Sequence, residues 1–260
     1  MKVFTFFYDR YTTATTSIEL EKWGIEHYVF MHTEEAHSKF IEGNTIKGTP
    51  IITNNPKGLA YQKNSALEML EDDEWGVFMS DDFSVIKAFN FDRVKIDDKV
   101  EFDIKNQKEF RYSDRPTMAQ LFTIFPYLIK QAERLNIKMI GFSSNENPRN
   151  VQRKFGFKGL VDGRMFLAKK SELRFDNNVN SIDDYYFTLL NIEKNSNNLI
   201  LNWISPEFQR YSAGGVGSKE ARKEQRKRDC AYLVDRFPRL VKFADKAGYD
   251  KGEHIKIVAR

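Results

Sequence analysis

Cysteine and histidine are scarce in this chain, which has one cysteine and four histidines among 260 residues. A single thiol, that of Cys230, excludes a disulfide within the chain and suits a reducing compartment. No histidine lies near Cys230 in the sequence, so a thiol activated by a neighbouring imidazole is not expected. We therefore look for the chemistry of this protein in other side chains.

Long apolar runs are also absent from the sequence. No run approaches the roughly 20 apolar residues that a membrane-spanning helix needs. The first ten residues, MKVFTFFYDR, have an apolar centre too short for a signal peptide and lack a small-residue cleavage site. The sequence therefore predicts a cytoplasmic protein with no membrane partner.

Apolar and aromatic residues, by contrast, are plentiful, at 41% and 14%, with 22 phenylalanines. This is enough apolar material for a core, so disorder over the whole chain is not expected. The phenylalanines are spread along the apolar segments, which favours packing over a base-stacking surface. The length fits one large α/β domain, or a domain with a sizeable appendage.

The order of the predicted elements indicates an α/β fold. The early part of the chain predicts strands at 2–8, 27–32, 49–53 and 76–79 and helices at 12–23 and 58–70. This alternation predicts a Rossmann-like, mostly parallel central sheet flanked by helices. The later part predicts a hairpin at 93–104, a helix at 116–136 with a bend or break at Pro126, strands at 137–142 and 164–168, a helix capped by Ser181, and a charged helix from 219 to about 243.

The most informative motif is WGVFMSDDF, residues 75–83, in which an apolar run ends in Ser80, Asp81 and Asp82. The pattern predicts a buried strand whose acids emerge at its C-terminal edge, where open α/β sheets bind ligands. Adjacent carboxylates can hold a divalent cation, which in turn neutralises phosphates. The alternative is that Ser80 or Asp81 only caps the following turn or helix.

Three further features accompany this motif. Tyr8, Asp9 and Arg10 follow the first strand, KGLAYQKN at 57–64 precedes the motif, and Asp183 and Asp184 follow it about a hundred residues later. In this order the chain resembles glycosyltransferases of the GT-A fold. There, a G-x-x-x-x-[RK]-N helix precedes a metal-binding D-x-D strand, and a later acidic pair positions or activates the acceptor. Gly58, Lys63 and Asn64 match the helix pattern.

Within that fold, the second half is similar to the TET/JBP-associated glycosyltransferases, through the helix from Pro116, the strand IKMIGF and the stretch GRMFLAKKS before SIDDYYF. The resemblance covers residues 1–215. It implies a nucleotide-sugar half at 1–110, an acceptor half at 111–215 and a basic extension at 216–260. It also implies a bacteriophage enzyme, acting inside the infected bacterial cell, that adds sugar to 5-hydroxymethylcytosine in DNA.

The resemblance also assigns residues to the donor, a nucleotide sugar for which we expect UDP. The donor-binding residues it implies are Tyr8, Arg10, Lys57, Lys63, Asn64 and Asp81. Asp82 would hold Mn²⁺ or Mg²⁺ together with the diphosphate oxygens, because Ser80 replaces the first acid of D-x-D and a hydroxyl is a poor ligand. His254 is the candidate for the C-terminal histidine that many GT-A enzymes add to the metal.

Asp183 and Asp184 are the predicted catalytic acids, one of which would take the proton of the acceptor hydroxyl if the reaction inverts the anomeric centre. Two adjacent acids at a helix start can raise each other's pKa. The alternative is that these two carboxylates only pair favourably with the helix dipole.

Positive charge is concentrated at the C-terminal end. Residues 219–260 hold 13 lysines and arginines against 7 acids, a balance of +6, which leaves −2 for the rest of a chain whose net charge is +4. Candidate contacts with a DNA backbone in the helix KEARKEQRKR are Lys219, Arg222, Lys223 and Arg226. The alternative is a solvated helix, in which Glu220 and Glu224 form pairs with cations one turn away.

The leading interpretation is therefore a metal-dependent DNA glycosyltransferase. A second interpretation keeps the fold but takes a glycan, lipid or protein as acceptor. A third is a non-catalytic nucleic-acid-binding protein in which both acidic pairs are caps. A metal-dependent nuclease is less favoured, since its acids would cluster with lysine or histidine in tight motifs that the chain lacks.

Overall fold

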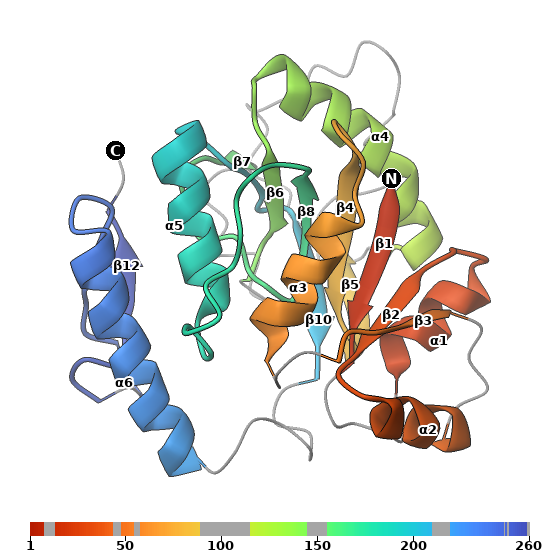
Figure 1. Ribbon diagram of the computed structural model, residues 1–260. Coiled ribbons are helices and arrows are strands. Elements are labelled where there is room, and N and C mark those ends of the chain that lie inside the picture. The colour runs from red at the N-terminus through yellow and green to blue at the C-terminus, as the bar shows by residue number, and fades with distance from the viewer. Residues whose placement is uncertain are drawn as a thin grey trace.

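An eight-stranded sheet forms the centre of the computed structural model, which describes residues 1–7, 14–43, 48–54, 58–88, 115–144, 155–209, 219–246, 248 and 250–258. The strand order is β3-β2-β1-β4-β8-β6-β9-β7 (Figure 1). The strands of this sheet are β1 Lys2–Phe6, β2 Tyr28–Met31, β3 Thr49–Ile52, β4 Trp75–Ser80, β6 Met139–Phe142, β7 Phe155–Gly156, β8 Met165–Lys169 and β9 Leu199–Leu201. Two smaller sheets pair β5 Phe83–Ala88 with β10 Ile204–Phe208, and β11 Val241–Phe243 with β12 Ile255–Ile257.

Six helices accompany these strands in the described part of the chain. They are α1 Thr15–Lys22, α2 Glu34–Gly43, α3 Leu59–Glu68, α4 Met118–Arg134, α5 Asp183–Asn195 and α6 Lys219–Arg236. None of the helices in these ranges is both long and apolar enough to cross a membrane.

The N-terminal half of the sheet is parallel, as the alternation of strands and helices predicts. β1 lies between β2 and β4 and runs parallel to both, and β3 adds to β2 in the same direction. β8 then reverses direction, because it is antiparallel to both β4 and β6, while β9 is again parallel to β6. The α/β class and the mostly parallel sheet are confirmed. The C-terminal end of β4 therefore lies beside the N-terminal end of β8.

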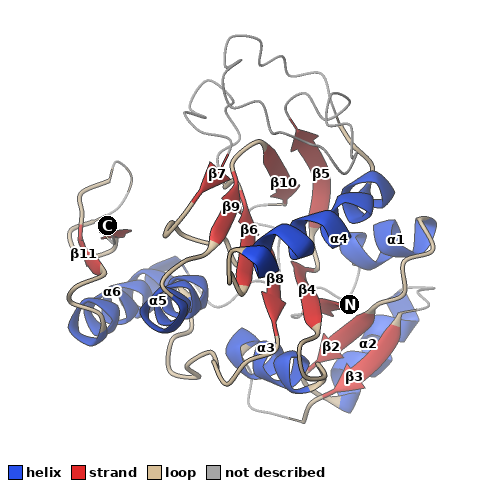
Figure 2. Cartoon of the chain, turned by 90° about the horizontal axis from the view of Figure 1, so that it is seen from above, coloured by secondary structure: helices blue, strands red, loops and turns tan. Residues whose placement is uncertain are grey.

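Phenylalanine fills one face of this sheet. Phe4 and Phe78 lie side by side on β1 and β4, with ring centroids 5.3 Å apart, and Phe166 of β8 stacks on Phe78 at 4.8 Å. α3 and α5 cover this face, through residues such as Leu67 and Phe187. α1 and α4 cover the opposite face (Figure 2). The predicted role of phenylalanine in packing is thus confirmed on this face.

α4 begins at a capping box formed by Thr117 and Gln120. The hydroxyl of Thr117 accepts from the backbone N–H of Gln120, whose side chain accepts from the N–H of Thr117. The helix continues through Pro126 without a break, contrary to one of the two outcomes that we expected there. Its buried face, which includes Leu121, Phe125 and Leu128, packs against the sheet on both sides of the proline and offsets the lost hydrogen bond.

The structure corrects other predictions from the sequence. α6 ends at Arg236 and not near residue 243, because Pro238 cannot continue a helix and the chain then enters β11. Ser181 does not cap α5; the N-cap is Ile182, and no side-chain cap bond is present. The sequence patterns also missed α2 and the short strands β5, β7, β9, β10, β11 and β12. The predicted hairpin at 93–104 lies outside the described residues.

The C-terminal segment packs as a layer on α5. Cys230, Leu233 and Phe237 of α6 contact a cluster of buried residues from the start and middle of α5, with Val241 and Ile255 of the β11–β12 hairpin beneath them. α6 and the hairpin lie on the outer side of α5, away from the central sheet (Figures 1 and 2). The basic extension is therefore a helix with a hairpin, held to the α/β domain by an apolar core.

Candidate active site

The site centres on an ion pair between α3 and the first residue of α5. Nζ of Lys63 lies 2.6 Å from Oδ2 of Asp183, with 4% and 14% of the two side chains exposed. The same Nζ lies 5.1 Å from the ring centroid of Phe175. The sequence predicted both residues as functional, but 119 intervening residues separate them, and only the fold brings them together.

Burial makes this pair consequential. Lys63 lies on the face of α3 that packs into the phenylalanine core, where an unpaired ammonium group would be strongly disfavoured. Asp183 offsets that cost, and its own carboxylate also lies in the first turn of α5, where the helix dipole favours negative charge. The two groups therefore depend on each other for charge compensation.

Asp184 is the acid with the clearest perturbation. Burial, with the charges of Asp183 and Asp162, raises its pKa from 3.8 to about 7, although Lys63 and the backbone N–H of Gly163 act in the opposite direction. A carboxylate with a pKa near neutrality is a better proton acceptor than an ordinary one. The oxygen Oδ2 of Asp183 is occupied by Lys63. Asp184 is therefore the better candidate for a general base.

A short segment, residues 162–164, completes this cluster and was missed in the sequence. Arg164 binds Asp162 through two nitrogens, with Nε 2.9 Å from Oδ1 and Nη2 2.6 Å from Oδ2. The backbone N–H of Gly163 points to Oδ2 of Asp184 at 3.4 Å. A Cβ atom at Gly163 would lie only 2.8 Å from Cβ of Asp184, so this close approach requires glycine. The one available signal was an Asp-Gly-Arg tripeptide directly before a predicted strand.

Ser80, Asp81 and Asp82 lie at the C-terminal end of β4, as predicted. Both acids are buried, with 7% and 8% of each residue exposed. Their backbone is held from several directions. The N–H of Thr16 donates to the carbonyl of Asp81 at 3.2 Å, and the N–H of Gln209 donates to that of Asp82 at 2.8 Å. The backbone that follows β4 is therefore held by hydrogen bonds from α1 and from the residue after β10.

The 162–164 segment also contacts the end of β4. The N–H of Ser80 donates to the carbonyl of Arg164 at 2.8 Å, while the neighbouring Gly163 contacts Asp184. This segment therefore touches both Ser80, the residue before Asp81, and Asp184 at the start of α5.

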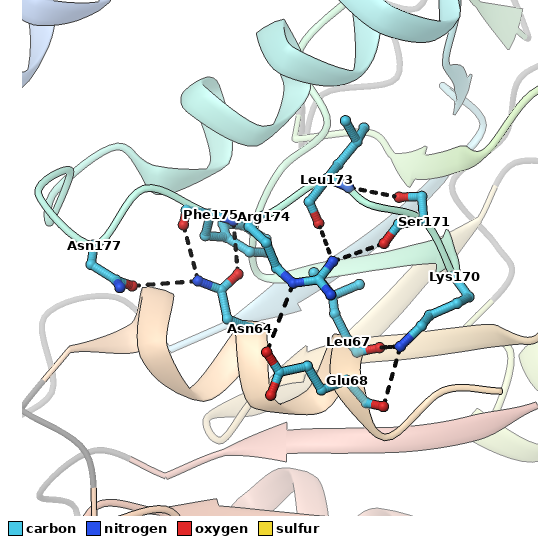
Figure 3. A network of polar contacts seen from close by, with 9 residues as sticks. All are labelled: Asn64, Leu67, Glu68, Lys170, Ser171, Leu173, Arg174, Phe175 and Asn177. Atoms are coloured by element: carbon cyan, nitrogen blue, oxygen red, sulfur yellow. Dashed lines mark hydrogen bonds and ion pairs between the residues drawn. The ribbon is translucent and has the colours of Figure 1, made fainter. Parts of the chain in front are cut away.

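Asn64 has a different environment from that of Lys63. Its amide accepts from the backbone N–H of Phe175 at 2.8 Å and donates to the carbonyl of the same residue at 3.0 Å (Figure 3). Lys170 donates to the last carbonyls of α3, those of Leu67 and Glu68. Asn64 therefore ties α3 to the 170–177 segment, which leads to the acids of α5, and its amide is engaged by the chain itself.

The predicted donor contacts Tyr8, Arg10 and Lys57 lie outside the described residues. Those residues follow β1 and precede α3 in the sequence. Gln62 of α3 is fully buried. Its side-chain amide donates two long hydrogen bonds, to the carbonyl of Phe7, directly after β1, and to that of Phe30 in β2. Its Oε1 has no hydrogen-bond partner among the described residues. It is a polar group of this region that the sequence patterns did not single out.

The predicted metal ligands are not brought together. Asp82 is at the β4 edge, whereas His254 precedes β12 on the outer side of α5 (Figure 1). Burial, with the positive charges of Lys246 and Arg226, lowers the pKa of His254. Among the described residues, no group of three or more histidine, cysteine or acidic side chains could hold a metal ion. The acids at 81 and 82 offer only oxygen donors, which suits a hard cation that shares its shell with phosphates.

The predicted DNA-binding cations lie on α6, where two of them have partners within the chain. Lys223 pairs with Asp250 at 3.2 Å, and Nε of Arg226 donates to the carbonyl of Glu253 at 2.8 Å. Both contacts face the loop between β11 and β12. Arg222 is exposed, and Lys219 is the first residue of the helix. Lys223 and Arg226 therefore also stabilise the C-terminal layer.

Neither a scan against protein-family models nor a search of curated proteins finds a match for this chain. The functional conclusion therefore depends on the geometry of the site.

Proposed function

We propose that this protein is a glycosyltransferase that transfers a sugar from a nucleotide-linked donor, with UDP the expected nucleotide, to a hydroxyl group. The observation that carries the proposal is the cluster of the buried Lys63 with the half-buried Asp183 and Asp184. It combines an ion pair at 2.6 Å with a neighbouring acid whose pKa is raised to about 7. Such a perturbed group beside a specific charged partner is typical of catalytic sites.

The donor half of the reaction is assigned to the β4 edge. Asp82 would hold a Mn²⁺ or Mg²⁺ ion, with Asp81 beside it and the donor phosphates completing the shell. When bound, this cation would stabilise the charge that develops on the leaving diphosphate. The burial of both acids and the fixed backbone around them support a preorganised edge.

The acceptor half is assigned to Asp184. In a reaction that inverts the anomeric centre, the acceptor oxygen bonds to the anomeric carbon while the bond from that carbon to the diphosphate breaks. The acceptor proton then passes to the Asp184 carboxylate, which must be ionised beforehand. Lys63 neutralises Asp183, so that the site does not carry two uncompensated charges next to each other.

For the acceptor we propose 5-hydroxymethylcytosine in DNA, in line with the resemblance seen in the sequence. The basic balance of the C-terminal residues and the exposed Arg222 on α6 support a polyanionic acceptor. The ion pair at Lys223 reduces the contribution that this helix can make, since part of its charge is already compensated.

The test is an incubation of the full chain with hydroxymethylated DNA, a panel of nucleotide sugars and Mn²⁺. We expect a gain in DNA mass equal to one sugar per modified base, with nucleotide diphosphate released in equal amount. The Asp184→Asn variant should form both products about 10³-fold more slowly. Nucleotide release with sugar on a glycan, lipid or protein would overturn the DNA acceptor only. No release with any donor and acceptor would overturn the enzymatic proposal.

A further inference from the structure

The segment that leads into α5, residues 170–182, is held on two sides. On one side, α3 binds it through Asn64 and through the ion pair of Glu68 with Arg174 (Figure 3). On the other side, α6 binds it through Asp229 and Tyr232. The acids of α5 follow this segment directly, so their position depends on both helices.

The contact at Asp229 is the tighter of the two from α6. This residue is 3% exposed, and its Oδ2 accepts from both the N–H and the hydroxyl of Ser181, at 2.8 and 2.7 Å. Its Oδ1 accepts from Gln225 at 2.6 Å. All three hydrogen bonds are short, and the carboxylate is removed from water. Ser181 therefore has a fixed position two residues before Asp183.

Apolar packing reinforces this contact. Ile182, the N-cap of α5, is 1% exposed and lies in the same cluster as Cys230 and Leu233 of α6. Cys230 and Leu233, which follow Asp229 on α6, thus hold Ile182 against this helix. The start of α5 is fixed by a polar anchor at Ser181 and an apolar anchor at Ile182.

We propose that Asp229 is a positioning residue, which from the C-terminal helix fixes the start of α5 and so holds Asp183 and Asp184 against Lys63. This inference deepens the proposed function, since it makes the basic extension a structural part of the transfer site. Helix α6, which the sequence predicted to contact DNA, would therefore also hold Asp183 and Asp184 in position through its buried side.

The consequence is measurable on Asp184. The groups that act on this carboxylate are Asp183 and the Tyr185 N–H on its own helix, Lys63 of α3, and Asp162 with the Gly163 N–H before β8. If the start of α5 loosens, Asp184 gains contact with water, and its pKa falls toward the ordinary range. Asp229 itself is not among these groups, so any effect of its removal must pass through position.

The experiment is a ¹³C NMR titration of aspartate carboxyl carbons in the full chain, with Asp184 assigned from the Asp184→Asn variant. In Asp229→Ala we expect the midpoint of Asp184 to fall by about one unit. Asp229→Asn keeps an oxygen acceptor for Ser181, and Gln225 can turn its amide to match, so we expect the midpoint to stay near that of the natural chain.

Tyr232→Phe is the matched control. It removes another hydrogen bond from α6 to the same segment, that of the Tyr232 hydroxyl to Asp176 at 2.7 Å, but farther from the acids. We expect no change in the midpoint of Asp184. An unchanged midpoint in folded Asp229→Ala, or an equal shift in Tyr232→Phe, would overturn the proposal. If Asp229→Ala does not fold, Ser181→Ala takes its place. A downward shift of the Asp184 midpoint, smaller than one unit, would then support the proposal, and no shift would overturn it.

The titration needs no substrate, so it separates this inference from the proposed function. A chain that transfers no sugar but shows the shift retains the positioning role and loses the assigned reaction. A chain that transfers sugar should lose about tenfold or more in kcat in Asp229→Ala, with KM for the donor within about twofold. Transfer with unchanged kcat and an unchanged midpoint would leave the reaction standing and remove the role of Asp229.

Discussion

The protein contains two pairs of adjacent aspartates, and their surroundings differ. Asp81 and Asp82 follow a strand, and the backbone N–H groups of Thr16 and Gln209 donate to their carbonyls. Asp183 and Asp184 begin a helix, where a buried lysine binds one acid and the other has a raised pKa. The same Asp-Asp dipeptide thus has a backbone held by hydrogen bonds at the end of β4, and an acid with a raised pKa at the start of α5.

The difference shows how the neighbours of a carboxylate decide its chemistry. At the β4 edge, two adjacent carboxylates offer oxygen donors, which suit a cation that brings its own phosphates. At α5, a lysine on one side and acids on the other push two adjacent carboxylates toward different roles. We therefore propose that the acids at the β4 edge bind the metal and that the acids of α5 take up the proton.

The largest effect is expected from Asp184→Asn. Loss of the proposed general base should lower kcat about 10³-fold in the transfer assay, and should remove the pH limb that we expect near pH 7 for the natural chain. The activity of the natural chain should fall as the pH drops below that value, because the base becomes protonated. Asp82→Asn is the comparison.

We expect Asp82→Asn to raise the Mn²⁺ concentration required for half-maximal rate while the limb near pH 7 remains. A limb that survives in Asp184→Asn and disappears in Asp82→Asn would reverse the two assignments.

Lys63→Met should strongly reduce stability. It keeps the volume of the side chain but leaves Asp183 buried without its cation, which we expect to cost about 3 kcal/mol in the free energy of unfolding. Lys2→Met is the matched control. Its pair with Glu74 is 2.7 Å long but more exposed, so its loss should cost about 1 kcal/mol or less. Urea unfolding at pH 7 measures both, and equal costs would contradict the importance of burial at Lys63.

The stability of the chain should also depend on pH through Asp184. Its pKa is higher in the folded protein, about 7, than the ordinary value of 3.8, so folding favours the protonated acid. The contribution of Asp184 to stability is therefore fully present below pH 4 and is lost as the pH rises to about 7. Asp184→Asn does not titrate, and its free energy of unfolding should exceed that of the natural chain by a margin that grows over this interval, up to about 4 kcal/mol. A constant difference between pH 4 and pH 8 would argue against the raised pKa.

Gly163→Ala should perturb Asp184 of α5 and Lys63 of α3. The added Cβ would meet Cβ of Asp184 at 2.8 Å and Nζ of Lys63 at 3.3 Å, so these side chains must shift. We expect kcat to fall about tenfold, with the metal requirement of the β4 edge unchanged. Gly58→Ala is the control, because the added Cβ would lie 3.4 Å from its nearest atom, an ordinary contact distance. Gly24→Ala is unsuitable, because Gly24 has φ +66°, where a residue with a side chain is strained. Equal losses in Gly163→Ala and Gly58→Ala would indicate a general effect on folding.

The smallest effect is expected on the surface of α6. Arg222→Ala should lower the slope of log affinity against log salt for DNA by about one, and weaken binding at low salt without changing kcat. Lys39→Ala on α2 provides the control, since it removes an exposed cation from a different helix. No difference between the two variants would remove α6 from the DNA-binding surface.

Much of the fold was predictable from local patterns. The strands now seen as β1, β2, β3, β4, β6 and β8 coincide with apolar or β-branched runs, and the alternation with α1 and α3 correctly indicated a parallel sheet. The short strands β9 and β10 were not predicted, because three to five residues without a clear period carry little signal. Helix α4 was predicted, and it does not break at Pro126 because tertiary packing outweighs the local effect of the proline.

The sequence by itself determined which side chains are available: acids after one apolar run, acids before another helix, and a lysine inside an apolar face. Only the tertiary structure decided that Lys63 contacts Asp183, that residues 162–164 contact both Ser80 and Asp184, and that Asp229 anchors the start of α5. The physical reason is that charge interactions and burial depend on distance in space. Those distances are set by the packing of α3, α5 and α6, elements that are far apart along the chain.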